Sequence, residues 1–149
     1  MRAEQRMRIE RDCRWLSLEF AMLNDSRRYE ALVELFTPDG IFRRPLAPDN
    51  PLQGREAILS DLRRKAVDVV SHHVCTNIHI SVIDEHDAEG SVYYTVYRHS
   101  GVVESALAFR FSGTVYVGNY SDRYRRTPQG WLFSDRVARN RFFLEGQTA

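Results

Sequence analysis

The sequence lacks the features that mark most metal and cofactor proteins. Its 149 residues include only two cysteines, Cys13 and Cys75, and no CxxC pair, so neither a disulfide framework nor a thiolate metal site is predicted. Clustered Cys/His ligand spacing and a glycine-rich phosphate loop are also missing. We therefore expect no metal and no cofactor, and free buried thiols in a reducing compartment, the cytoplasm.

Long apolar runs and an excess of charge of one sign are missing as well. The uninterrupted apolar stretches are only a few residues long, too short to span a membrane, and the charged N-terminus has no apolar run behind it. The 21 basic and 20 acidic residues give a formal net charge of +1. No overall field favours nucleic acid or a membrane as a partner. Lys65 is the sole lysine and the other basic residues are arginine, which we interpret as a bias of composition.

The apolar residues that are present suffice for a single domain over residues 1–149, since 43% of the chain is hydrophobic. Residues 4–24 predict an amphipathic helix, because apolar side chains recur there at spacings of three and four. Trp15 and Leu18 are expected to widen its apolar stripe. Two shorter helices are predicted, at residues 29–36 and 55–67.

The rest of the chain predicts strands separated by turn signals. Residues 37–40, Thr-Pro-Asp-Gly, are typical of a tight turn, and the proline-rich residues 44–53 are typical of a loop. Strands are predicted at residues 41–43, 71–82, 91–99, 109–125 and 131–143. Helices gathered ahead of hairpin-connected strands indicate an α+β fold, with a curved antiparallel or mixed sheet and helices on one face.

The strand at residues 71–82 carries the most informative pattern. Apolar and polar residues alternate from Ile78 to Val82, so one side faces a core. Two adjacent histidines, His72 and His73, stand near its start, and histidine is the side chain most easily tuned to move protons near neutral pH. Strict alternation places His72 on the core side, whereas a β-bulge before Ile78 would place His73 there. We choose His73 for the pocket, with His72 as the alternative.

Four segments stand out by their order and spacing along the chain. They are residues 24–32 leading to Leu35-Phe36-Thr37-Pro38-Asp39-Gly40; Gly54-Arg55-Glu56-Ala57-Ile58; His72-His73-Val74 before Thr76-Asn77-Ile78; and Tyr120-Ser121-Asp122-Arg123-Tyr124 before Gly130-Trp131. Together they resemble the SnoaL-like branch of the nuclear-transport-factor-2-like superfamily. The resemblance implies a cone-shaped α+β barrel in which three helices from the N-terminal half and a curved sheet enclose a hydrophobic pocket.

Within that superfamily the chain is similar to the scytalone dehydratases and related cofactor-free lyases, which implies a catalytic pair. In those proteins an Asp after the first long helix pairs with a His on the strand after the third helix, and the matching residues are Asp25 and His73. A second histidine on the following strand corresponds to His99. The tyrosine that precedes the Asp in the dehydratases is Asn24 here, so the substrate contacts differ. The remaining expected substrate contacts are Phe20, Phe42, Tyr94 and Tyr120.

The resemblance leads to the hypothesis of a dehydratase-like lyase, or an isomerase, that acts on a small apolar hydroxy or carbonyl compound. His73 would be its general base, oriented by Asp25. The alternative is a non-catalytic assembly protein, such as the small subunit of a ring-hydroxylating dioxygenase, which has a similar sequence texture near residues 97–100. Tyr and Val on both faces of the sheet also predict a homodimer or homotrimer formed through the outer face.

Overall fold

The structure, a computed structural model, describes residues 1–101 and 107–146. The helices are α1 (Ala3–Asp25), α2 (Tyr29–Val33) and α3 (Arg55–Arg63). The strands are β1 (Phe36–Arg44), β2 (Ala47–Gln53), β3 (Val70–Val82), β4 (Asp87–His99), β5 (Thr114–Thr127) and β6 (Gly130–Glu145).

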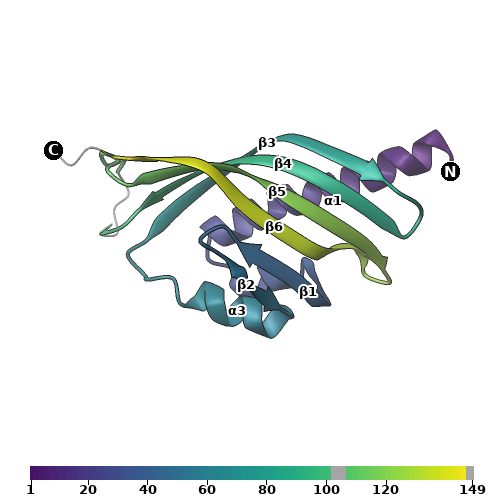
Figure 1. Ribbon diagram of the computed structural model, residues 1–149, viewed down its shortest axis with the longest axis horizontal. Coiled ribbons are helices and arrows are strands. Elements are labelled where there is room, and N and C mark those ends of the chain that lie inside the picture. The colour runs from purple at the N-terminus through teal and green to yellow at the C-terminus, as the bar shows by residue number, and fades with distance from the viewer. Residues whose placement is uncertain (102–106, 147–149) are drawn as a thin grey trace.

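The six strands form one curved sheet in the order β2-β1-β6-β5-β4-β3 (Figure 1). Neighbouring strands are antiparallel except β1 and β6, which run parallel. Helix α1 lies along one face of the sheet and α3 lies beside β1 and β2. The predicted α+β class with a mixed sheet is confirmed.

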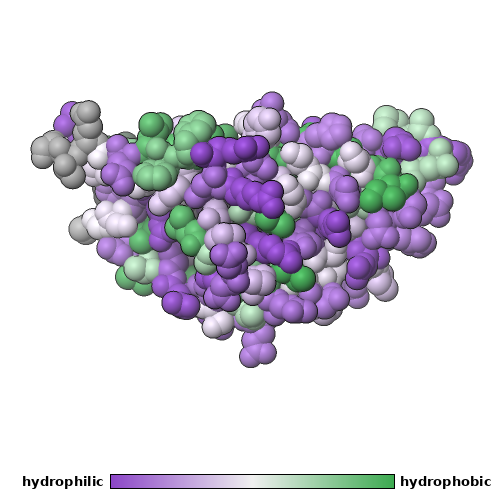
Figure 2. Space-filling model, viewed as in Figure 1, coloured by the Kyte–Doolittle hydropathy of each residue, from purple (hydrophilic) through white to green (hydrophobic). Residues whose placement is uncertain are grey.

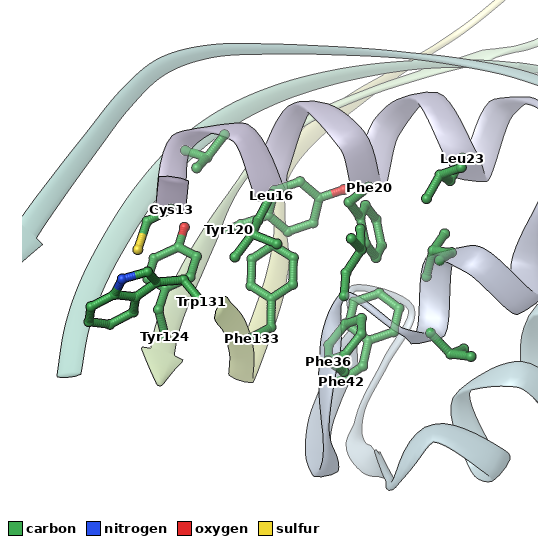
Figure 3. Close-up of a cluster of buried hydrophobic side chains, with 14 of the residues drawn as sticks. Cys13, Leu16, Phe20, Leu23, Phe36, Phe42, Tyr120, Tyr124, Trp131 and Phe133 are labelled. Atoms are coloured by element: carbon green, nitrogen blue, oxygen red, sulfur yellow. The ribbon is translucent and has the colours of Figure 1, made fainter. Parts of the chain in front are cut away.

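Helix α1 supplies the middle of the hydrophobic core. Its buried side carries Cys13, Leu16 and Phe20 at the predicted spacing. Figure 3 shows these side chains pointing from the helix toward aromatic rings of the sheet. The Phe20 ring packs edge-on, with centroids 5.8 to 6.3 Å apart, against the rings of Phe36, Phe42, Tyr120 and Phe133.

The predicted widening of the apolar stripe of α1 is wrong. Trp15 is 53% exposed and Leu18 is 43% exposed. A helix that covers a sheet from one side buries only the stripe that faces the sheet, and these two residues lie outside that stripe.

The segment around Pro38 also differs from its prediction. Residues 37–40 do not form a tight turn but belong to β1, where the register with β6 shifts between Phe36 and Ile41. The predicted loop at residues 44–53 contains β2, which lies at the edge of the sheet. An edge strand needs hydrogen bonds on one side only, so it accommodates the prolines of this segment.

Two predicted boundaries are also corrected. Helix α3 ends at Arg63 rather than near residue 67. Strand β5 begins at Thr114 rather than at residue 109. The pairing of β5 with β6 shifts between Val117 and Gly118.

Candidate active site

A cavity of about 310 Å³ lies between α1, α3 and the inner face of the sheet. His73 lines it, and so do all five residues predicted to contact a substrate, which are Phe20, Asn24, Phe42, Tyr94 and Tyr120. Most of its wall is apolar, and the polar groups gather where α1 ends and β3 begins. Such a hollow, with few polar groups among apolar ones, is typical of a small-molecule site.

A β-bulge determines which histidine faces the cavity. The pairing of β3 with β4 shifts between Thr76 and His79, and Asn77 adopts a left-handed backbone conformation with φ 48°. The extra residue reverses the alternation, so that His73 and Ile80 both face inward although they are seven positions apart. His72 is exposed on the outer face. The prediction that a bulge turns His73 toward the core side is confirmed.

Asp25 and His73 form a hydrogen-bonded pair. The Nδ1 atom of His73 lies 2.5 Å from Oδ1 of Asp25, and the backbone N–H of His73 donates to Oδ2 at 2.7 Å. The hydroxyl of Ser71 donates to Oδ1 at 3.2 Å. The side chains of His73 and Asp25 are 10% and 19% exposed. Because both carboxylate oxygens bind the same residue, the orientation of the imidazole ring is fixed.

The same contacts set the charge of Asp25. Burial alone would raise the pKa of Asp25, but hydrogen bonds from the side chain and backbone of His73, together with Ser71, lower this pKa below its ordinary value. The carboxylate is therefore ionised and acts as the acceptor. With Nδ1 of His73 directed at Asp25, the second ring nitrogen, Nε2, has no hydrogen-bond partner within residues 1–101 and 107–146.

Lys65 joins this group although its sequence position gave no indication of a role. Its ammonium donates to Oδ1 of Asn24 and to the hydroxyl of Ser71, both at 3.1 Å. Burial, reinforced by the charges of Arg27 and Arg98, lowers the pKa of Lys65 to about 8. The single lysine of the chain thus lines the cavity.

His99 does not lie in this cavity. Its Nδ1 accepts a hydrogen bond from the backbone N–H of Ser112, and its ring packs on Phe109 and Phe111. The reason is the alternation of β4, in which Tyr94, Val96 and Arg98 face inward, so the next residue faces outward. Placing His99 beside Asp25 and His73 was therefore wrong, and Arg98 occupies the position in its stead.

Two tyrosines, Tyr94 of β4 and Tyr120 of β5, also line the cavity. The hydroxyl of Tyr94 donates to Oδ1 of Asn140 at 2.7 Å, and its ring lies 4.6 Å from that of Tyr120. Burial raises the pKa of both Tyr94 and Tyr120, so both hydroxyls are neutral. The hydroxyl of Tyr120 can donate a hydrogen bond to a bound oxygen, whereas the single O–H of Tyr94 is directed at Asn140, and neither group serves as a base near neutral pH.

A second buried charge pair lies deeper in the sheet. The guanidinium of Arg136 donates to both oxygens of Asp122, at 2.9 and 3.0 Å, and to the hydroxyl of Ser17. Both side chains of the ion pair are 0% exposed. The guanidinium also lies over the rings of Phe20, Phe133 and Tyr120, the last at 3.8 Å. This pair fills the core and leaves no space for a ligand.

In the described part of the chain, no group of three or more His, Cys, Asp or Glu residues is arranged to hold a metal ion. None of the helices α1 to α3 is long and apolar enough to cross a membrane.

The sequence matches the SnoaL-like domain over residues 5–137, and the chain belongs to this family. A search of curated proteins returned no match. Three solved structures illustrate what the fold is similar to. A candidate scytalone dehydratase from Novosphingobium aromaticivorans is 17% identical, with a TM-score of 0.82, over 99% of this chain and 94% of the other.

A type 2 hexachlorocyclohexane dehydrochlorinase, LinA, is 15% identical with a TM-score of 0.82, over 99% of this chain and 95% of the other. An NTF2-like protein with a cystatin-like fold, also from N. aromaticivorans, is 23% identical with a TM-score of 0.73, over 91% of this chain and 83% of the other. At these identities the likeness shows the fold, and the fold is the NTF2-like cone that the sequence resemblance implied.

Proposed function

We propose that the protein is a cofactor-free lyase or isomerase in which His73, oriented by Asp25, removes a proton from a small, mostly apolar substrate. The observation that carries the proposal is the 2.5 Å contact between Nδ1 of His73 and Oδ1 of Asp25 at the wall of the cavity. A carboxylate at Nδ1 holds the proton there, so the lone pair is on Nε2, the nitrogen for which the described part of the chain offers no partner.

The chemistry follows from this arrangement. Nε2 of His73 takes a proton from a carbon next to a carbonyl group, and Asp25 stabilises the imidazolium that forms. The electron pair of the broken C–H bond moves toward the carbonyl carbon, giving an enolate. A lyase then expels hydroxide, or another leaving group, from the neighbouring carbon, whereas an isomerase returns the proton to a different carbon. The neutral hydroxyl of Tyr120 is suited to donate a hydrogen bond to the enolate oxygen.

The comparisons support an elimination reaction in a limited way. Two of the similar structures bear the names of a dehydratase and a dehydrochlorinase, both of which are eliminating enzymes. Fold alone does not decide function, so the weight of the proposal lies on the site. The non-catalytic assembly protein remains the alternative, and the exposed apolar residues of the outer sheet face are the feature that favours it.

The test is a panel of small hydroxy-ketones, with formation of the unsaturated ketone followed by absorbance and isomerisation followed by proton NMR. We expect turnover with at least one member of the panel, and its loss in His73→Ala. The matched control is His72→Ala, which removes the neighbouring histidine from the outer face of the same strand. Turnover that survives in His73→Ala as well as in His72→Ala would refute the role of His73, and no turnover with any member of the panel would favour the assembly protein.

A further inference from the structure

Two cations at one side of the cavity lack a carboxylate partner. Lys65 lines the cavity and its ammonium donates only to neutral oxygens, those of Asn24 and Ser71. Arg98 also lines the cavity, is partly buried, and its guanidinium has no hydrogen bond or ion pair within residues 1–101 and 107–146. The nitrogen atoms of Arg98 are not fully buried, so their N–H groups are free to bind an acceptor that enters the cavity.

The two cations lie next to each other. Ser71 of β3 is paired directly with Arg98 of β4, and both side chains face the cavity. Since directly opposed residues on one face of a sheet are neighbours, the ammonium bound to Ser71 is close to the Arg98 guanidinium. Their mutual repulsion is one reason that the pKa of Lys65 is low.

The carboxylates near these two cations are already bound to other side chains. Asp25 is bound to His73 and Ser71. Asp61, at the wall of the same cavity, forms ion pairs with Arg44 and Arg64. The side of the cavity near Lys65 therefore has an excess of positive charge, and an anionic group of a ligand would neutralise it.

We propose that Lys65 and Arg98 form an anion subsite that binds the carboxylate of the substrate. An ammonium has three N–H donors, of which Asn24 and Ser71 take two, so one is left for a ligand oxygen. A guanidinium binds a carboxylate through two parallel N–H groups. The substrate class is thus a small hydroxy or oxo acid whose apolar body lies against Phe20, Phe42 and Tyr120.

This inference rests on the proposed function, because it takes the cavity to be the substrate site, and it names the group that orients the substrate. Ser71 touches both Lys65 and Asp25. A carboxylate held at Lys65 is therefore only a few atoms from the catalytic pair. When the carboxylate is held there, a carbon two or three bonds away from it comes within reach of Nε2 of His73, as proton transfer requires.

The test uses calorimetric titration with two unreactive probes of nearly equal shape, cinnamate and its neutral amide, cinnamamide. We expect the wild-type protein to bind cinnamate at least about tenfold more tightly than cinnamamide, since a hydrogen bond to a charged group is worth that much. Lys65→Met and Arg98→Met should each remove most of this preference while leaving the affinity for cinnamamide unchanged. Arg64→Met is the control, since it removes an equal charge from an exposed side chain one residue from Lys65.

A second arm uses pH. The affinity for cinnamate should fall as the pH rises past about 8 and Lys65 loses its charge, and Lys65→Met should not show this fall. The charged groups that shift the pKa of Lys65 are Arg27, Arg98 and Asp25, the ring of Tyr29 lies 5.8 Å from its ammonium, and all four residues are unchanged in that variant.

Equal affinity for the two probes, or no binding of either, would overturn the anion subsite, as would a cinnamate preference that both variants keep. Neither probe is turned over, so the titration is independent of catalysis. Binding of cinnamate together with an inactive hydroxy-ketone panel would retain the subsite and count against the proposed reaction.

Discussion

Two aspartates of this protein each bind a nitrogen-containing side chain, but the two pairs differ in their surroundings. Asp122 and Arg136 are 0% exposed and are enclosed by aromatic rings and Ser17. Asp25 and His73 are 19% and 10% exposed, and one nitrogen of the histidine has no protein partner within the described residues.

The contrast separates a structural role from a catalytic one. A charge pair whose polar atoms are closed off by the core holds elements together, here α1 with β5 and β6. A pair that leaves one basic atom at a cavity wall can take part in chemistry, and the rest of that pair serves to orient the basic atom. Substitutions in the Asp25–His73 pair should therefore affect activity, and substitutions in the Asp122–Arg136 pair should affect stability.

The largest effect is expected for Asp25→Asn. This substitution keeps the shape of the side chain but removes the charge that holds the proton at Nδ1 of His73. We expect turnover to fall by about 10²–10⁴-fold, the range of a general-base contribution. Asp39→Asn, a change at an exposed aspartate, is the control and should have wild-type turnover. Near-normal turnover in Asp25→Asn with a folded protein would contradict the role of the pair.

The next effect is expected at the enclosed pair, and in stability rather than activity. Asp122→Asn leaves the Arg136 charge buried without compensation, so we expect a loss of about 3–5 kcal/mol in the free energy of unfolding. Urea denaturation measures it. The double variant Asp122→Leu with Arg136→Met should be less destabilised than the single one, because no charge stays buried alone. A loss in Asp25→Asn as large as in Asp122→Asn would remove the distinction between the pairs.

The sequence predicted the Asp25–His73 pair better than the residues around it. Asp25 and His73 were predicted because both match the catalytic pair that the resemblance implies. An expected β-bulge in the strand then placed His73, rather than His72, on the core side.

Tyr94 and His99 were both predicted to lie in the pocket, but they are five positions apart. A regular strand directs residues at an odd spacing to opposite faces. This odd spacing was the evidence in the sequence against placing His99 in the pocket. Lys65 was missed because the predicted helix ran to residue 67 and included it as an ordinary polar residue, whereas α3 ends at Arg63.

The fold was predicted in class and in the order of most elements. The errors gathered where local signals oppose tertiary pairing. The prolines of residues 44–53 indicate a loop in isolation, but pairing with β1 at the sheet edge makes most of the segment a strand. Residues 37–40 have the composition of a turn, but they lie within β1, between Phe36 and Ile41, which both pair with β6.

Self-association is predicted through the outer sheet face, far from both charge pairs. The pairing of β3 to β6 places Tyr97, Val115 and Leu144 in one row and Val74, Val117 and Phe142 in the next. Tyr97, Phe142 and Leu144 are 43%, 57% and 60% exposed. Figure 2 shows apolar residues on the surface near the end of the molecule that carries the C-terminus.

An exposed apolar area of this kind favours burial against a second copy. Light scattering at micromolar concentration should therefore give the mass of a homodimer or homotrimer. Phe142→Ser should shift the mass toward the monomer and leave ligand binding unchanged. A monomer mass for the wild-type protein would contradict this prediction.

The smallest effect concerns acid pH. The pKa of Asp25 is lower in the folded protein than its ordinary value of 3.8, so its ionisation contributes stability above that value. The contribution is lost as the pH falls through the folded pKa. Because Asp25 is partly exposed, we expect less than about 1 kcal/mol. The difference in unfolding free energy between wild type and Asp25→Asn should therefore shrink on acidification, and a difference that grows would contradict the assignment.

The central claim is that Asp25 fixes the proton of His73 on Nδ1 and leaves Nε2 basic toward the cavity. Long-range ¹H–¹⁵N correlation spectra of the histidine rings test it without a substrate, and His73→Ala identifies the signals of this residue among the five histidines. We predict that the neutral ring of His73 shows a protonated Nδ1 and an unprotonated Nε2, and that Asp25→Asn disturbs this tautomer. A wild-type spectrum in which Nε2 carries the proton would contradict the account.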